Sequence, residues 1–326
     1  MREKIIYAAI YTLLTAVCAL AQTPSTTPAL LPSPTPISLA MILTEAEKQT
    51  VNYREEFKNL LAIETKTFEE YDREGEIEDQ KIVESNFFVY QSAKDEGVSS
   101  ELRNVIKVDG KLVPDSQARA DRFLAEIQKT TTVEKELDKI QDEGLRYDKT
   151  IKLSGFTLFE GFVLSDNLRP YFDFKLLGSE TYQGNEVYVV SYQQTRKTPF
   201  ITVNEKATKE KGMKVDFDVS VPGALKKTDK FLRGKLLIDA KTFQIWREER
   251  QVAVQTATPI IALDTVLEYQ TSEFGILVPK RIYFLENTIR KTSNEGEFTA
   301  VKNTQVNFDY SKFRKSDTDV QILDDK

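Results

Sequence analysis

The chain has 326 residues, a net charge of −6 and no histidine. The absence of histidine excludes a Ser-His-Asp triad, a Cys-His dyad, and zinc or haem ligation by histidine. The single cysteine, Cys18, lies near the N-terminus, so thiolate catalysis and iron–sulfur ligation are excluded from the rest of the chain. The mild acidity gives no electrostatic reason to expect a nucleic-acid partner.

Residues 1–21 have the pattern of a secretory signal peptide. Two cations at the start are followed by an apolar run from Ile5 to Val17, and Ala19-Leu20-Ala21 offers small residues at a cleavage site. The alternative is a retained anchor, but the run is shorter than the ~20 residues that span a bilayer. With no later cysteine and no Asn-x-Ser/Thr sequon, we expect a protein exported to the periplasm or outer membrane of a Gram-negative bacterium, with no stable membrane span after cleavage.

The rest of the chain divides by composition. Residues 22–43 are rich in Pro, Ser and Thr and are predicted to form a disordered tether, with recognition by a proline-binding partner as the alternative. Residues 44–315 are predicted to form a single α+β domain. Residues 316–326 form an acidic tail that is expected to fray.

The first half of the predicted domain mixes a helix with long strands. The capping-box pattern Thr44-Glu45-Ala46-Glu47 predicts a helix that begins near Thr44. Period-2 alternation then predicts a long hairpin that turns at Glu74-Gly75, and a third strand that ends at Asp109-Gly110. Two further helical segments are predicted, one from Pro114 and one over residues 131–144.

The second half reads as consecutive antiparallel strands. Alternation begins at Phe172 and turns at Gln183-Gly184-Asn185. Residues 198–230 are rich in lysine and are interpreted as an excursion between strands. Residues 231–285 alternate apolar and charged positions in strands joined by tight turns, and TQVNFDY forms the last strand. The fold class predicted is α+β, a curved antiparallel sheet wrapped on helices as a half-open barrel.

The sequence offers little for catalysis. No GxSxG, Ser-x-x-Lys, GxxxxGK or GxGxxG motif occurs. Glu248 and Glu249 are adjacent in a predicted strand and point to opposite faces, so they are interpreted as surface or ion-pairing residues. Asp216 and Asp218 lack the glycine-containing loop of a calcium site, and so does the Asp317 region. We therefore predict no catalytic residue, no cofactor and no metal.

The apolar positions of the strands are the candidate binding residues. Strand parity places Trp246 with Val252, Leu267 with Tyr269, and Ile282 with Phe284. One interpretation is that these six side chains fill a closed core against the helices. The other is that an imperfectly covered curved sheet leaves an apolar cavity that takes an acyl chain or another hydrophobic ligand.

The strand and turn pattern between Tyr171 and Phe313 resembles the lipoprotein-sorting superfamily, the LolA/LolB-like periplasmic carriers and their relatives. The matching features are an Ile-Asp-x-x-Thr turn at Ile238-Asp239 and Thr242, and a Phe-Gly-x-x-Val-Pro turn at 274–279. The resemblance implies a half-barrel of about eleven strands closed by helices over a hydrophobic cavity. It also implies binding of lipid-modified or hydrophobic partners.

From the sequence we therefore expect a non-enzymatic exported protein that binds a hydrophobic ligand or a lipidated envelope protein. One alternative is an envelope interaction or sensor module with a filled core. A carboxylate-based hydrolase is the other alternative, and it needs two acidic side chains that converge in a cleft at roughly 5–10 Å.

Overall fold

The structure is a computed structural model, and it describes residues 37–57, 60–91, 99–116, 118, 142, 144–148, 157, 160–204, 215–292 and 297–315. The leader, residues 22–36, most of the two predicted helical segments after Pro114 and the acidic tail lie outside these residues. The residues from Ser38 onward form one compact unit, and it is this unit that is described below.

Long strands dominate the unit. The bounds of the helices are α1 (Leu39–Glu56), η2 (Phe162–Leu164), η3 (Arg169–Tyr171) and η4 (Gly223–Leu225). The strands are β1 (Leu60–Tyr71), β2 (Ile77–Gln91), β3 (Ser99–Val108), β4 (Lys111–Leu112), β5 (Phe172–Tyr182), β6 (Asn185–Gln194), β7 (Ile201–Val203), β8 (Val215–Phe217), β9 (Lys230–Asp239), β10 (Ile245–Val254), β11 (Ile260–Thr271), β12 (Leu277–Lys291) and β13 (Phe298–Lys315).

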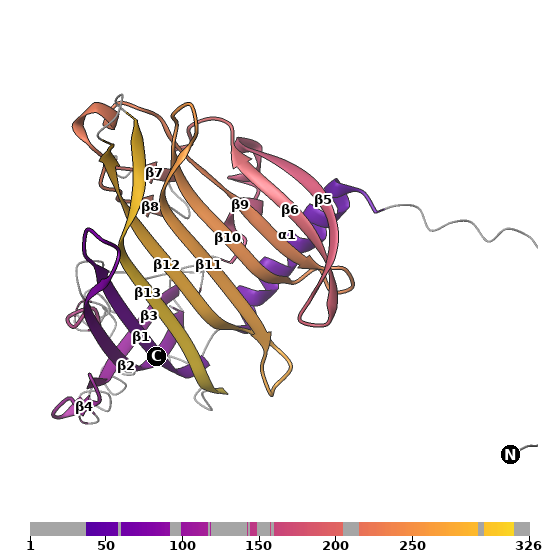
Figure 1. The fold of residues 1–326 in the computed structure, drawn as a ribbon. Coiled ribbons are helices and arrows are strands. Elements are labelled where there is room, and N and C mark those ends of the chain that lie inside the picture. Colours follow the sequence, from indigo (N-terminus) through magenta and orange to yellow (C-terminus); the bar gives the residue numbers. More distant parts are fainter. Residues whose placement is uncertain are drawn as a thin grey trace, which may run out of the picture. The chain divides into compact units, whose positions relative to one another are not determined.

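Eleven of the strands form one curved antiparallel sheet in the order β4-β3-β2-β1-β13-β12-β11-β10-β9-β6-β5 (Figure 1). The last strand, β13, pairs with β1, so the two ends of the unit meet in the middle of the sheet. The sheet ends at β4 and β5 and is not closed into a barrel. The predicted fold class is thereby confirmed.

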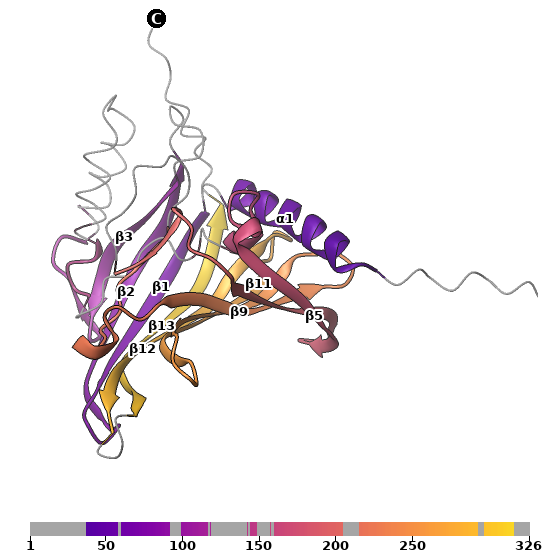
Figure 2. The same cartoon turned by 90° about the horizontal axis from the view of Figure 1, so that it is seen from above.

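α1 lies on the concave side of this sheet (Figure 2). The helix begins at Leu39, and the Ser38 hydroxyl caps it by accepting a hydrogen bond from the Met41 amide at 3.2 Å. The predicted start at Thr44 is therefore wrong, because the Thr44 capping-box pattern lies inside a helix that already has its cap. The buried residues of α1 form one stripe: Ile42, Leu43, Ala46, Thr50 and Tyr53.

The predicted tight turns are found where the sequence places them. Asp109 and Gly110 both have positive φ, and so do Gln183 and Gly184. In the turn between β9 and β10, one carboxylate oxygen of Asp239 accepts hydrogen bonds from the amides of Lys241 and Thr242. This gives the Ile-Asp-x-x-Thr pattern a physical reason, since the aspartate satisfies amides that the turn leaves free.

The lysine-rich excursion contains a small element of its own. β7 and β8 pair in parallel as a two-stranded sheet, and η4 follows before the chain enters β9. The Asn204 side chain connects this element to the segment after β8, because it donates to the Val219 carbonyl and accepts from the Val219 amide. Among the described residues, no helix has both the length and the apolar character needed to cross a membrane.

Candidate functional site

Five of the six candidate binding residues are buried on the concave face. Each of these five is at most 5% exposed: Val252, Leu267, Tyr269, Ile282 and Phe284. Leu267 of β11 lies opposite Ile282 of β12, and Thr265 lies opposite Phe284. Because paired residues of neighbouring strands point to the same face, the register brings Leu267, Ile282 and Phe284 together.

α1 covers this apolar face with aromatic side chains. The ring of Tyr53 meets the ring of Tyr269 edge-on, with 5.7 Å between centroids. Tyr53 also stacks on Phe57 at 5.1 Å, and Phe57 packs against Phe87 of β2 at 6.5 Å. In this structure the space above Tyr269 is therefore occupied by side chains of α1.

Trp246 lies apart from the other candidates by virtue of a bulge in β10. Ile245 pairs with Ile238 and Arg247 pairs with Leu237, so Trp246 is the extra residue between two ladder pairs. Ile245 is fully buried beside α1, whereas Trp246 is half-buried. The Trp246 indole N–H is nonetheless buried and has no hydrogen-bond partner.

The same face also carries charged residues that were interpreted from the sequence as surface or cross-strand pairs. Glu248 and Arg250 of β10 are 0% and 2% exposed, and Arg250 Nη2 lies 2.9 Å from Glu248 Oε1. The ion-pairing interpretation is right, but the pair is buried and lies along one strand. Strand parity could have located it, because Glu248 and Arg250 have the same parity as Val252.

Two neighbours complete the surroundings of Glu248. The Gly161 amide donates to Glu248 Oε2 at 3.0 Å, and the Tyr192 hydroxyl donates to Glu248 Oε1 and to the Glu249 carbonyl. Tyr192 reaches this place because Gly234 has no side chain: a Cβ there would lie 2.5 Å from the Tyr192 hydroxyl and would collide with the Glu249 carbonyl. Gly234 therefore makes room for the tyrosine.

A second charged cluster joins β1 to β3. Arg103 donates two hydrogen bonds to the Glu64 carboxylate, at 2.7 and 2.8 Å, and one to Glu101 at 3.0 Å. The Tyr310 hydroxyl donates to Glu64 at 2.9 Å. Burial alone would raise the pKa of Glu64, but the positive charges of Arg103 and Lys66 outweigh it and leave the pKa lowered.

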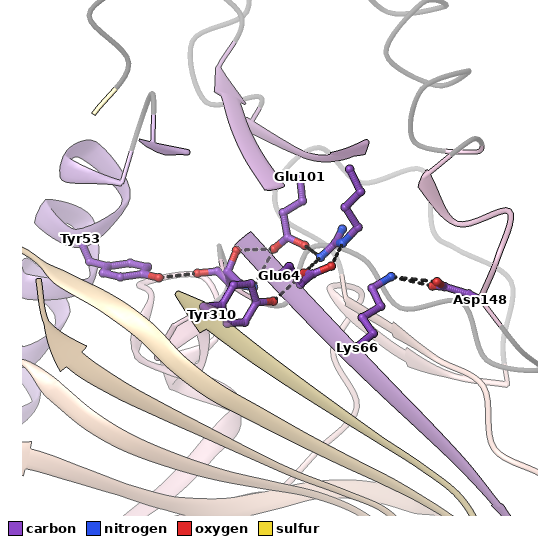
Figure 3. A network of polar contacts seen from close by, with 8 residues as sticks. Tyr53, Glu64, Lys66, Glu101, Asp148 and Tyr310 are labelled. Carbon is purple, nitrogen blue, oxygen red and sulfur yellow. Dashed lines mark hydrogen bonds and ion pairs between the residues drawn. The ribbon is translucent and has the colours of Figure 1, made fainter. Parts of the chain in front are cut away.

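Thr157 links this cluster to α1. Its amide and its hydroxyl both donate to Glu101, at 2.7 and 2.6 Å, and its carbonyl accepts the Tyr53 hydroxyl at 2.9 Å. A continuous set of polar contacts thus runs from Tyr53 of α1 through Glu101 to Glu64 and Tyr310 (Figure 3). The helix is held on the sheet by a buried hydrogen bond as well as by ring contacts.

Lys66 extends the charged region along β1. Its ammonium lies 2.8 Å from an Asp148 carboxylate oxygen, and both side chains are 1% exposed (Figure 3). Burial and the charge of Arg103 lower the pKa of Lys66, against the opposing effect of Glu64 and Asp148. Removal of one partner from such a pair leaves an uncompensated buried charge, so the pair fixes residues 145–148 to the concave face.

Glu160 differs from the other buried carboxyls. It is 2% exposed, and among the described residues its Oε2 atom has no hydrogen-bond partner, although a backbone hydrogen bond with Ile245 acts to lower its pKa. Burial raises the pKa of Glu160 well above its usual range, and the nearby charge of Glu248 raises it further. The Tyr269 hydroxyl is another buried polar atom without a hydrogen-bond partner among the described residues. Burial raises the pKa of Tyr269 well above its usual range, and the charge of Glu160 adds to this effect.

Taken together, the site is an apolar surface between two buried ion-pair clusters, covered by α1. Its charged groups are paired with one another and shielded from solvent, which suits the positioning of backbone segments better than proton transfer to a substrate. In the part of the chain that the structure describes, no group of three or more acidic, histidine or cysteine side chains could hold a metal ion.

Several solved structures are similar to this chain at low sequence identity. A DUF1329 family protein from Desulfovibrio piger is 10% identical, with 86% of this chain and 97% of that chain covered, at a TM-score of 0.34. A domain named for outer-membrane lipoprotein sorting, from Vibrio parahaemolyticus, is 9% identical over 85% and 97%, at 0.35. A LolA superfamily protein from Nitrosomonas europaea is 9% identical over 89% and 98%, at 0.28.

LolA-superfamily proteins are thus among the structures similar to this chain, in line with the resemblance drawn from the sequence. No protein-family model and no curated protein sequence matches the chain. Because the TM-scores are below 0.5, nothing about ligand, partner or localisation follows from these likenesses. The function proposed below rests on the residues of the chain itself.

Proposed function

We propose that the protein is an exported, non-enzymatic binding protein that takes an acyl chain, of a free lipid or of a lipidated partner, between the concave face of its sheet and α1. The proposed contact residues on the sheet are Val252, Leu267, Tyr269, Ile282 and Phe284, with Trp246 at the margin. The export signal of residues 1–21 sets the proposed location in the periplasm or at the outer membrane.

The observation that carries this proposal is the way in which α1 covers the apolar face. Among the described residues, α1 covers it through Tyr53 and Phe57, and the Tyr269 hydroxyl and the Glu160 Oε2 atom stay buried without a hydrogen-bond partner. An acyl chain that displaced α1 would make apolar contacts with the sheet in place of those made by Tyr53 and Phe57. Little buried apolar area of the sheet would therefore be lost. The Tyr269 hydroxyl and the Glu160 Oε2 atom, which have no hydrogen-bond partner among the described residues, could then pair with the polar head of the ligand.

The polar contacts of α1 stabilise the covered state, in which the helix lies on the concave face, relative to an open state in which it does not. The Tyr53 hydroxyl donates to the Thr157 carbonyl, and Glu47 lies 3.6 Å from Arg169. The first contact is buried and the second is partly exposed, so the first contributes more to closure. If binding requires an open state, loss of this hydrogen bond raises the open population and therefore the apparent affinity.

The direct experiment is to purify the protein after export, identify co-purifying lipids by mass spectrometry and titrate it with a fluorescent fatty acid. N-terminal sequencing of the same sample tests cleavage after Ala21. Saturable uptake of the fatty acid supports the proposal. The absence of both co-purifying lipid and uptake contradicts it.

The Tyr53→Phe variant tests the role of α1 as cover. It keeps the ring but removes a hydrogen bond worth about 1 kcal/mol, so the fatty-acid affinity is expected to rise about fivefold. Tyr71→Phe is the matched control, because Tyr71 also donates a hydrogen bond, to Glu69 at 2.9 Å, but lies at the end of β1. Equal affinities of the Tyr53→Phe variant and the wild type would show that ligand does not enter beneath α1.

A protein-interaction module with a filled core is the second candidate, and one observation favours it. All five candidates on the concave face are buried, while Leu177 on the edge strand β5 is 57% exposed. Under this alternative, the fatty-acid titration gives no signal, and a partner strand docks beside β5.

A further inference from the structure

A pocket of about 300 Å³ lies where the end of β6 and the start of β7 meet the segment between η4 and β9. Its volume is at the lower end of the range for ligand pockets, about 300–1,000 Å³. The lining residues are Gln194, Lys197, Thr198, Ile201, Val203, Lys226, Lys227, Thr228, Asp229 and Lys230.

The charge of this lysine pocket is opposite to that of the chain. Four lysines and one aspartate line it, a net charge of 4 − 1 = +3, whereas the chain as a whole has −6. The aspartate, Asp229, lies 4.0 Å from Lys197, and both side chains are more than 70% exposed. A pair of that kind is screened by water and leaves most of the positive potential of the pocket in place.

Hydrogen bonds position one ammonium group and one hydroxyl group in the walls of the pocket. The Lys230 ammonium donates to the carbonyls of Lys226 and Thr228, at 3.1 and 3.0 Å. The Thr198 side chain is 7% exposed, and its hydroxyl accepts the Phe200 amide. Ammonium groups and hydroxyls around one hollow form the donor set that a multiply charged oxyanion requires.

We propose that the lysine pocket is a binding site for a phosphate group, on a lipid headgroup or on a soluble phosphate compound. Several like charges at one hollow repel one another, and a bound oxyanion removes that repulsion. Lysine binds phosphate as a point charge, so the site is expected to select ligands by their negative charge and their size. The site is separate from the acyl-chain surface beneath α1, so each proposal can fail alone.

Two arms of one experiment distinguish the sources of the phosphate. The protein purified after export is mixed with vesicles of phosphatidylglycerol in phosphatidylcholine, or with inorganic phosphate and pyrophosphate in a calorimeter. Vesicles of phosphatidylcholine alone serve as the uncharged surface. Binding to the anionic vesicles alone assigns the site to a lipid headgroup, and binding to the free anions assigns it to a soluble phosphate.

The Lys226→Gln/Lys227→Gln double variant tests the pocket itself. Each lysine near an anionic surface contributes about fivefold to binding, so the double variant is expected to bind about 25-fold more weakly. The Lys226→Arg/Lys227→Arg variant keeps the charge and is expected to retain most of the binding. Lys280→Gln/Lys291→Gln is the matched control, since both of its lysines are exposed on β12.

An equal loss of binding in the pocket variant and in the β12 control would overturn the proposal, because it would show attraction to overall charge only. Failure of wild-type protein to bind either the vesicles or the free anions would also overturn it. Thermal midpoints of the variants, measured without anion, confirm that the substitutions leave the fold intact.

Discussion

Glu160 is a buried carboxyl of the concave face that belongs to neither of the two ion-pair clusters. Its Oε2 atom has no partner, and burial, with the charge of Glu248 beside it, raises its pKa well above the usual range. The folded protein therefore holds a proton on Glu160 at pH values where the unfolded chain has released it. The stability from this protonation is complete below the unfolded pKa of about 4.3 and is lost as pH rises toward the folded value.

The Glu160→Gln variant is expected to remove this pH dependence. Glutamine has nearly the same shape and cannot ionise, so its stability relative to wild type should increase with pH. The difference is expected to grow from pH 5 to pH 7, by at most about 1.4 kcal/mol per pH unit for one proton. Urea unfolding at both pH values measures it.

Glu56→Gln on the exposed side of α1 is the control for this comparison, and its unfolding free energy should follow that of wild type across the same range. If the Glu160→Gln and wild-type curves stay parallel from pH 5 to 7, then Glu160 is ionised in the folded protein. In that case the positive charge of Arg54, which lowers the pKa of Glu160, offsets the effect of burial.

Strand parity in the sequence found five apolar residues of the concave face, but it missed the bulge at Trp246 and did not interpret the charges of that face. The same alternation that places Leu267 beside Tyr269 also places Glu248 and Arg250 on the face of Val252. Charge argues for exposure, and only the buried partners Gly161 and Tyr192 show why these residues can be inside. Those partners lie 87 and 56 residues away from Glu248, which no local pattern reveals.

At the scale of elements, strands were easier to predict than the helix that covers them. The turns at Asp109-Gly110 and Gln183-Gly184 contain residue types that favour positive φ, and each strand shows apolar alternation in its own sequence. The start of α1 was misplaced because two possible N-cap residues, Ser38 and Thr44, lie six residues apart. Only one of them can cap the helix, and the structure shows that it is Ser38. The position of α1 over Tyr269 depends on contacts across more than 200 residues of sequence, so sequence patterns did not place it.

Close packing between β9, β10 and β6 depends on Gly234. A methyl group at this position would meet the Tyr192 hydroxyl at 2.5 Å and the Glu249 carbonyl. The Gly234→Ala variant is therefore expected to lose about 1–3 kcal/mol of stability, as overpacked sites do. Chemical denaturation measures the loss, and fluorescence of the single tryptophan, Trp246 in the neighbouring strand, reports the transition.

Gly223→Ala is the matched control for this variant, because nothing lies within 4 Å of a Cβ at Gly223. It is expected to change stability by less than about 1 kcal/mol, in the stabilising direction if the backbone there tolerates alanine. Equal effects of the two substitutions would mean that Tyr192 can move aside without cost.

For the molecule as a whole, an open curved sheet with one face covered by a helix was predictable because alternation and turn spacing define antiparallel neighbours. The number of strands was implied only by resemblance, and the sequence does not determine that β13 pairs with β1. Whether the concave face is filled or open is a property of the covering elements. The sequence of the sheet therefore could not decide it.

A series of fatty acids of increasing chain length tests the proposed binding surface at this scale. Each additional buried CH₂ contributes about 0.8 kcal/mol, so the affinity should rise up to about fourfold per carbon until the chain is longer than the surface beneath α1. The ligand-bound protein should unfold at a higher temperature, since binding to the folded state alone stabilises it by mass action. Calorimetry should also show a negative heat-capacity change, the mark of apolar burial. An affinity that stays flat with chain length would place the ligand on charged groups at the surface and not on Leu267, Ile282 and Phe284.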